Sequence, residues 1–226
     1  MTQIRVYGAD LCRLTAEDCY PILDSSEAKR AASISHLLVR EEFVKTRALL
    51  RTVLGAYTDR SPRDFTFTTG VNGKPRLVGD DQIHFNVSHA AGRALIAIAP
   101  GAVGIDIERA DKSINHLAVA AEIFSPEEYA AVERAPRLDR SEIFFTIWTR
   151  KEAYLKATGC GFSANLERIS SMTPDREIED TSMPQGSEHW FAYDLPAPEF
   201  FRAALVTSSD SLEISMSDVS GILQAH

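Results

Sequence analysis

The sequence predicts an α+β fold, in which helical segments alternate with short strands. Apolar periodicity and terminal residues predict helices over residues 26–57, 124–134 and 141–158. Between the first two helices, apolar and polar residues alternate over 84–89 and 103–109, and residues 94–99 form an apolar run. Tight turns separate these three strand candidates, which predicts an antiparallel sheet.

Composition sets the general class of the protein. The 226 residues are 44% hydrophobic, enough for one large domain or two small, closely packed ones. A net charge of −8 argues against a general nucleic-acid binder, and no apolar run is long enough to span a bilayer. Three cysteines without a C-x-x-C pair favour a reduced, cytoplasmic protein. We expect a monomer with neither nucleic-acid nor membrane partners.

The strand candidate VGIDIER, residues 103–109, carries the clearest chemical signal. Alternation places Asp106 and Glu108 on one face, roughly 6–7 Å apart along a strand. Two carboxylates this close repel one another unless a proton or cation lies between them, and Mg²⁺ prefers such oxygen ligands. Taken alone, the pattern is more often a strand with a solvated acidic face.

Positive charge is concentrated upstream of this strand. Residues 26–63 contain eight Lys and Arg against four Asp and Glu. Arg47 and Arg51 are four residues apart and share a helix face, which suits either solvent exposure or a clamp for an anionic ligand. Lys74 lies in the turn VNGKPRL, where an ordinary hairpin lysine is the simpler interpretation.

Two later helices carry acidic residues that have competing explanations. Ser125 and Glu128 have the spacing of a capping box, which gives Glu128 a structural role. Glu152 and Lys156 are four residues apart in the helix 141–158, a spacing typical of a surface ion pair.

Taken in order, R-x-L-L-R, G-K-P, F-N-V-S-H, G-I-D-I-E, F-S-x-x-E and W-T-R-K-E-A-Y-L-K resemble the Sfp-type phosphopantetheinyl transferases. The resemblance covers roughly residues 25–165. It implies two similar α+β halves, 1–102 and 103–226, related by a pseudo-two-fold axis with the active site in the cleft between them. It also implies transfer of the phosphopantetheine arm of coenzyme A to a serine of an apo acyl or peptidyl carrier protein, with release of adenosine 3′,5′-bisphosphate.

The resemblance also implies a role for each matching residue. It makes Asp106, Glu108 and Glu152 ligands of Mg²⁺, and Glu128 the base that takes the serine proton, although the adjacent Glu127 leaves that assignment open by one position. It places Lys156 and His89 at the pyrophosphate of coenzyme A. The remaining contacts comprise Arg47, Lys74 and Ser88 near the 3′-phosphate, and Asn72, Gly73, Lys74 and Pro75 beside the adenine.

Two other functions compete with this one. The first is a Mg²⁺-dependent enzyme acting on a different diphosphate, and the second is a non-catalytic module that binds coenzyme A or carrier proteins. The carboxylates and Lys156 argue against the module, because a pure binder has no need of a metal site. Metal-dependent product formation separates enzyme from binder, and the identity of the acceptor separates the two enzymes.

Overall fold

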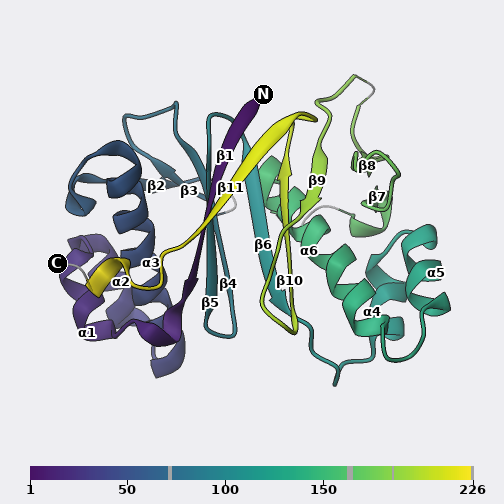
Figure 1. The fold of residues 1–226 in the computed structure, drawn as a ribbon, viewed down its shortest axis with the longest axis horizontal. Coiled ribbons are helices and arrows are strands. Elements are labelled where there is room, and N and C mark those ends of the chain that lie inside the picture. The colour runs from purple at the N-terminus through teal and green to yellow at the C-terminus, as the bar shows by residue number, and fades with distance from the viewer. Residues whose placement is uncertain (71–72, 162–164, 185, 225–226) are drawn as a thin grey trace.

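The computed structural model describes residues 1–70, 73–161, 165–184 and 186–224. Helices and mainly antiparallel sheets occupy separate layers, which confirms the α+β prediction (Figure 1). Two sheets meet at the centre of the molecule, and helices cover the outer side of each (Figure 1). The pseudo-two-fold relation between the halves stays a prediction.

The first sheet has the strand order β11-β1-β5-β4. Its pairs β1–β5 and β5–β4 are antiparallel, whereas β11 runs parallel to β1. The bounds are β1 (Thr2–Asp10), β4 (His84–Ala90), β5 (Arg93–Ala99) and β11 (Leu212–Asp218). A separate short hairpin joins β2 (Phe67–Thr69) to β3 (Pro75–Leu77).

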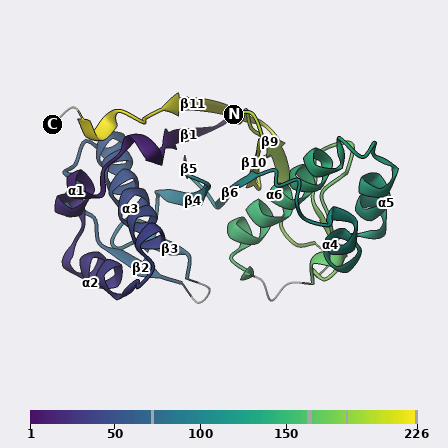
Figure 2. The same cartoon turned by 90° about the horizontal axis from the view of Figure 1, so that it is seen from below.

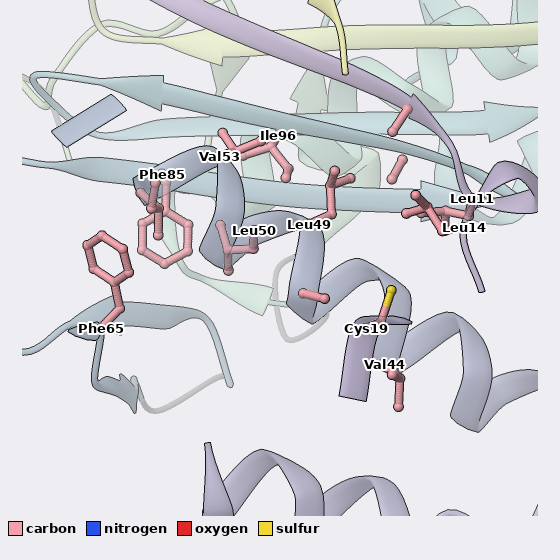
Figure 3. Close-up of a cluster of buried hydrophobic side chains, with 14 of the residues drawn as sticks. Leu11, Leu14, Cys19, Val44, Leu49, Leu50, Val53, Phe65, Phe85 and Ile96 are labelled. Carbon is pink, nitrogen blue, oxygen red and sulfur yellow. The ribbon is translucent and has the colours of Figure 1, made fainter. Parts of the chain in front are cut away.

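Three helices accompany the first sheet: α1 (Ala16–Cys19), α2 (Ser25–Ser33) and α3 (Leu37–Thr58). The long helix α3 lies against one face of the sheet (Figure 2). Figure 3 shows Leu49, Leu50 and Val53 of α3 in one buried cluster with Phe85 and Ile96 of the sheet. Each large apolar side chain buried here contributes roughly 1.5–3 kcal/mol of transfer free energy.

The helix expected over 26–57 is two helices. Asp24 caps α2 by accepting hydrogen bonds from the amides of Ser26 and Glu27, so the expected cap at Ser25 or Ser26 was one or two residues late. The extended backbone at Ile34 and His36 separates α2 from α3, which then passes the expected end at Gly55 and stops at Thr58.

The second sheet is antiparallel, with the order β6-β10-β9. Its strands are β6 (Val103–Arg109), β9 (Phe191–Asp194) and β10 (Phe201–Thr207), and β7 (Ile169–Ser170) pairs with β8 (Glu179–Asp180) nearby. The helices of this part are α4 (His116–Ile123), α5 (Pro126–Arg134) and α6 (Arg140–Thr158). Short 3₁₀ turns complete the described chain at Leu11–Arg13, Tyr20–Ile22, Pro62–Asp64, Leu166–Arg168 and Ile222–Gln224.

The strand β6 differs from expectation in two ways. It belongs to the second sheet, although the sequence suggested one antiparallel sheet with β4 and β5. It is also buried from Val103 to Ile107 instead of half-buried, because apolar side chains of both sheets cover one face and α6 covers the other. Asp106 is therefore only 2% exposed, which rules out a solvated acidic face.

Gly104 explains how α6 comes so close to β6. A Cβ atom at this position would lie 1.9 Å from the carbonyl oxygen of Ala153 and 2.5 Å from the amide nitrogen of Ala157. Only glycine permits this approach. The carboxylates of β6 and the polar residues of α6 are brought together by this packing.

The end of the chain crosses back to the first sheet. After β10, the strand β11 pairs with β1, and Val219 and Ile222 pack against the core beside α3. The predicted half 103–226 therefore does not hold as a spatial unit, since its last strand completes the sheet of the other half. Among the described residues, no helix is sufficiently long and apolar to cross a bilayer.

Candidate active site

A buried polar cluster lies where β4, β6 and α6 meet. The ammonium of Lys156 donates to Asp106 Oδ1 at 2.6 Å and to Ser88 Oγ at 2.9 Å. The Ser88 hydroxyl in turn donates to Asp106 Oδ1 at 2.8 Å. Lys156 thus forms its ion pair with a strand residue, not with Glu152 on its own helix as the spacing suggested. Lys156 is thereby joined to Asp106, 50 residues away in the sequence, and to Ser88, 68 residues away.

Glu152 adds a second carboxylate to this cluster. Burial, together with the negative charge of Asp106, raises the pKa of Glu152 to about 7, despite the opposing effect of Lys156. Glu152 Oε1 and Asp106 Oδ2 are both buried without a hydrogen-bond partner within the described protein. Two such oxygens are costly in a folded protein and suit the binding of a cation.

Glu108 is close enough to the other two carboxylates for Asp106 to act on its charge and for its own charge to act on Glu152. Its pKa is raised by burial and by Asp106, while Lys156 and a hydrogen bond from Trp148 act in the opposite direction. In the described ranges, no group of three or more His, Cys, Asp and Glu side chains is arranged to hold a metal ion. The three predicted metal ligands therefore do not form a preassembled site, and only Asp106 and Glu152 present unpartnered oxygens.

A cavity of about 270 Å³ opens beside this cluster. Its lining includes Gly73 from the β2–β3 turn, Pro75 from the start of β3, Asn86 from β4, and Glu152 and Lys156 from α6. The predicted adenine-binding turn and the predicted pyrophosphate-binding lysine thus face the same space. Asn72, the other predicted member of the turn, lies outside the described residues.

Lys74 also borders the cavity, but its ammonium is already engaged. It donates to three backbone carbonyls, those of Val103, Lys156 and Ala157. This corrects the expectation of a free phosphate contact on an exposed turn. No sequence pattern indicated these partners, since they are 29 to 83 residues away along the chain.

Ser88 and His89 are adjacent in β4 and face different environments. Ser88 is buried against β6, where its hydroxyl also accepts a hydrogen bond from the amide of Ile107. Its predicted contact with the 3′-phosphate therefore does not fit, because its hydroxyl is engaged by Asp106 and Lys156. His89 is exposed on the other side of the strand, 3.3 Å from a carboxylate oxygen of Glu42 in α3.

The two arginines of R-x-L-L-R have different environments. Arg51 is 0% exposed and is held by Asp24 at 2.5 Å and Glu27 at 2.6 Å, so it cannot clamp a ligand. Arg47 lies 3.3 Å from the other oxygen of Glu27 and retains some solvent exposure. Burial lowers the pKa of Arg47, an effect that Glu27 opposes.

Arg30, one of the basic residues of the segment 26–63, is a further candidate for binding an anion. Its guanidinium lies 5.4 Å from the ring centre of Phe43, and that of Arg47 lies 5.9 Å from the same ring. The charge of Arg30 contributes to lowering the pKa of Arg47. Two guanidinium groups around one ring favour an anion, because an anion removes their mutual repulsion. Because Arg30 and Arg47 are 17 residues apart, no helix-face pattern in the sequence predicts that they lie together.

The side chain of Glu128 is not accessible to a substrate. It is 0% exposed, and its Oε1 accepts hydrogen bonds from the amide and hydroxyl of Ser171. Its Oε2 accepts from the amide of Ser125 and forms an ion pair with buried Lys151 at 2.7 Å. The predicted base role therefore does not fit, whereas the capping box is confirmed. Glu127 is exposed on the first turn of α5.

We predict that Glu128→Gln destabilises the protein by about 3–5 kcal/mol, because it leaves the charge of Lys151 buried and uncompensated. Urea unfolding measures this loss. Glu127→Gln is the matched control on the same turn and should change stability by no more than about 0.5 kcal/mol. Adding Lys151→Met to Glu128→Gln should recover most of the loss. Wild-type stability of Glu128→Gln would show that the buried pair is unimportant.

A second prediction concerns the raised pKa of Glu152, which is about 7 in the folded protein and near 4.5 when exposed. Between these values the folded state binds the proton more tightly, so stability falls as pH rises from about 4.5 to about 7. In metal-free protein, Glu152→Gln should flatten this part of the stability curve and gain roughly 1–3 kcal/mol over wild type at pH 8. If the stability of the two proteins depends on pH in the same way, the raised pKa of Glu152 is contradicted.

Comparison with known proteins agrees with this arrangement. A family model for the 4′-phosphopantetheinyl transferase superfamily matches residues 102–204. The chain is 31% identical over 175 residues to a putative 4′-phosphopantetheinyl transferase of Synechocystis, covering 75% of this chain and 70% of the relative. It is 34% identical to the 4′-phosphopantetheinyl transferase HetI of Nostoc, covering 76% and 74%, and 25% identical to a Bacillus subtilis transferase, covering 89% and 91%.

The family model covers the strand β6 and the helix α6, which supply Asp106, Glu152 and Lys156 to the cluster. Similarity also extends to the Sfp protein of Bacillus subtilis, at 31% identity over 122 residues. The chain therefore belongs to the Sfp-type 4′-phosphopantetheinyl transferases, which transfer phosphopantetheine to carrier proteins.

Proposed function

We propose that the protein uses coenzyme A and Mg²⁺ to modify a serine of an apo acyl or peptidyl carrier protein. The serine oxygen forms a bond to the phosphorus that bears the pantetheine arm. The bond from that phosphorus to the bridging oxygen breaks, and adenosine 3′,5′-bisphosphate leaves. The observation that supports this proposal most strongly is the Asp106–Lys156 contact beside the unpartnered oxygen of Glu152.

The residues present fit a magnesium ion. Mg²⁺ in proteins is held by one or two carboxylates together with water and substrate phosphates. Asp106 and Glu152 supply two carboxylates with one unpartnered buried oxygen each, and Glu108 remains a candidate third ligand. When bound, the ion offsets negative charge on the diphosphate and on the leaving phosphate.

The protein's own cations complete the neutralisation of the diphosphate. Lys156 has a partly exposed ammonium at the edge of the cavity, where it can add a phosphate oxygen to its contacts with Asp106 and Ser88. We assign Arg47, with Arg30 beside it, to the 3′-phosphate, and His89 to the phosphates on the α3 side of β4. Phosphoryl transfer requires this positioning and charge compensation more than covalent work by the protein.

Glu152 is better placed than Glu128 to receive the serine proton. It borders the cavity, whereas Glu128 is 0% exposed. A glutamate can accept the proton if it lies within hydrogen-bond reach of the serine, directly or through a water. Glu128 keeps α5 attached to α6 through Lys151, and thereby supports the helix that carries Glu152 and Lys156.

A second cavity, of about 830 Å³, offers the carrier protein an approach from the opposite end of β6. Its lining includes Glu108, Lys112, Ile114, Phe145 and Phe200. Glu108 of β6 lines this larger cavity, whereas Lys156, the partner of Asp106, lines the smaller one. We assign the larger cavity to the segment that carries the acceptor serine.

The test mixes the protein with coenzyme A, Mg²⁺ and a panel of apo carrier proteins and measures acceptor mass. We predict a mass gain of one phosphopantetheine, abolished by EDTA and restored by Mg²⁺. Asp106→Asn should raise the Mg²⁺ concentration needed for half-maximal rate by at least about tenfold, because it removes a charged ligand. Asp210→Asn, a change at an exposed aspartate, is the matched control and should behave as wild type.

Other outcomes identify the competing functions. Binding of coenzyme A without any modified acceptor would indicate the non-catalytic module. Metal-dependent turnover of another diphosphate, with all carrier proteins unmodified, would indicate the different transferase. An unchanged Mg²⁺ requirement in Asp106→Asn would contradict the assignment of Asp106 to the metal.

A further inference from the structure

The inference starts from an unusual set of partners for one lysine. Lys74 lies at the end of the β2–β3 turn, and its ammonium donates at 3.0 Å to the carbonyl of Val103, at 2.6 Å to that of Lys156 and at 3.5 Å to that of Ala157. A lysine ammonium has three hydrogens to donate. All three are therefore satisfied by backbone carbonyls contributed by β6 and α6, with no carboxylate among these acceptors.

Two of those carbonyls lie in the last turn of α6, which ends at Thr158. Carbonyls in the last turn of a helix lack partners within the helix and carry its partial negative charge. A cation at this point both satisfies the carbonyls and stabilises the end of the helix. The third acceptor, Val103, begins β6, next to the position where Gly104 allows α6 to approach most closely.

The same lysine also fixes the turn on its own side. The carbonyl of Lys74 accepts a hydrogen bond from the amide of Gly70, and the amide of Gly73 donates to the carbonyl of Gly70. Gly73 has a φ of 79°, a left-handed conformation that favours glycine. Lys74 is thus tied through its backbone to the turn and through its side chain to α6.

These two attachments span the smaller cavity. Gly73 and Pro75 line one side, and Leu155, Lys156 and Gly159 line the other. The distance between the turn and α6 therefore depends on the Lys74 side chain. Lys156, whose carbonyl accepts from Lys74, is also the residue whose ammonium contacts Asp106.

We propose that Lys74 is a positioning residue: it holds the ligand-binding turn against the end of α6 and makes no direct contact with the 3′-phosphate of coenzyme A. The consequence is a preformed cavity in which the turn and Lys156 are already in place. Burial, with a smaller contribution from Arg76, lowers the pKa of Lys74 to about 8, so the ammonium remains mostly charged at neutral pH. The role rests on the proposed use of coenzyme A, whereas the attachment itself is testable without any ligand.

The first experiment measures amide hydrogen exchange in the unliganded protein. In Lys74→Met, the amides at the end of α6, including Ala157 and Gly159, should exchange at least about tenfold faster than in wild type. Amides in the β1–β11 pair serve as an internal reference and should be unchanged. Arg76→Met is the matched control, since it removes an exposed cation from the same hairpin. Unchanged exchange at the end of α6 in Lys74→Met would overturn the proposal.

The second experiment compares binding of coenzyme A with binding of dephospho-coenzyme A, which lacks the 3′-phosphate. A positioning role predicts that Lys74→Met raises Kd for both ligands by the same factor, at least about tenfold. Arg47→Ala provides the contrast, because loss of a 3′-phosphate contact weakens coenzyme A selectively. A selective loss for coenzyme A in Lys74→Met would instead make Lys74 a phosphate contact.

A third variant provides the test if Lys74→Met does not fold. Lys74→Arg keeps a cation but places a bulkier group among the three carbonyls, so it should weaken both ligands equally while retaining part of the exchange protection. Altered discrimination between the two ligands by Lys74→Arg would contradict the positioning role. If wild type binds neither ligand, the proposed function fails, and the exchange experiment still decides whether Lys74 anchors α6.

Discussion

The ion pair between Asp106 and Lys156 is the interaction on which the site depends. Three acidic side chains, Asp106, Glu108 and Glu152, lie on two elements that pack closely because Gly104 has no side chain. Burying such charges together is unfavourable unless a cation compensates them. Lys156 provides that compensation for Asp106 at 2.6 Å. Burial, together with the negative charge that Lys156 leaves uncompensated, raises the pKa of Glu152. A metal ion, bound together with a diphosphate, would compensate that charge.

Two other buried ion pairs support the elements that present ligand-binding groups. In the first half, Arg51 joins Asp24 and Glu27, which attaches α2 to α3 and places Glu27 beside Arg47. In the second, Lys151 joins Glu128, which attaches α5 to the helix carrying Glu152 and Lys156. Buried pairs contribute little net stability because desolvation offsets their attraction, but breaking one is costly. Their value here is geometric, since each one fixes the helix on which an exposed or half-exposed charge is displayed.

The sequence predicted the family, the α+β class and the positions of most strands and helices, because these follow from short motifs and local periodicity. It misassigned residues whose role depends on distant partners. Glu128 matched the position of the base, yet its partners bury it completely, and Arg51, which suited either solvent exposure or an anion clamp, is fully buried as well. Ser88 and Lys74 were predicted to contact phosphate, but their acceptors lie on β6 and α6. The return of β11 to the first sheet was equally hidden, since strand pairing over 200 residues leaves no local pattern.

The most direct measurement of the central claim is a double-mutant cycle on metal-free protein with Asp106→Asn and Lys156→Met. The free energy of unfolding is measured for wild type, both single variants and the double variant. A buried pair that neutralises the cluster predicts a coupling energy of at least about 1.5 kcal/mol between the two positions. Additivity within about 0.5 kcal/mol would mean that the two charges do not interact, and the electrostatic account of the site would be contradicted.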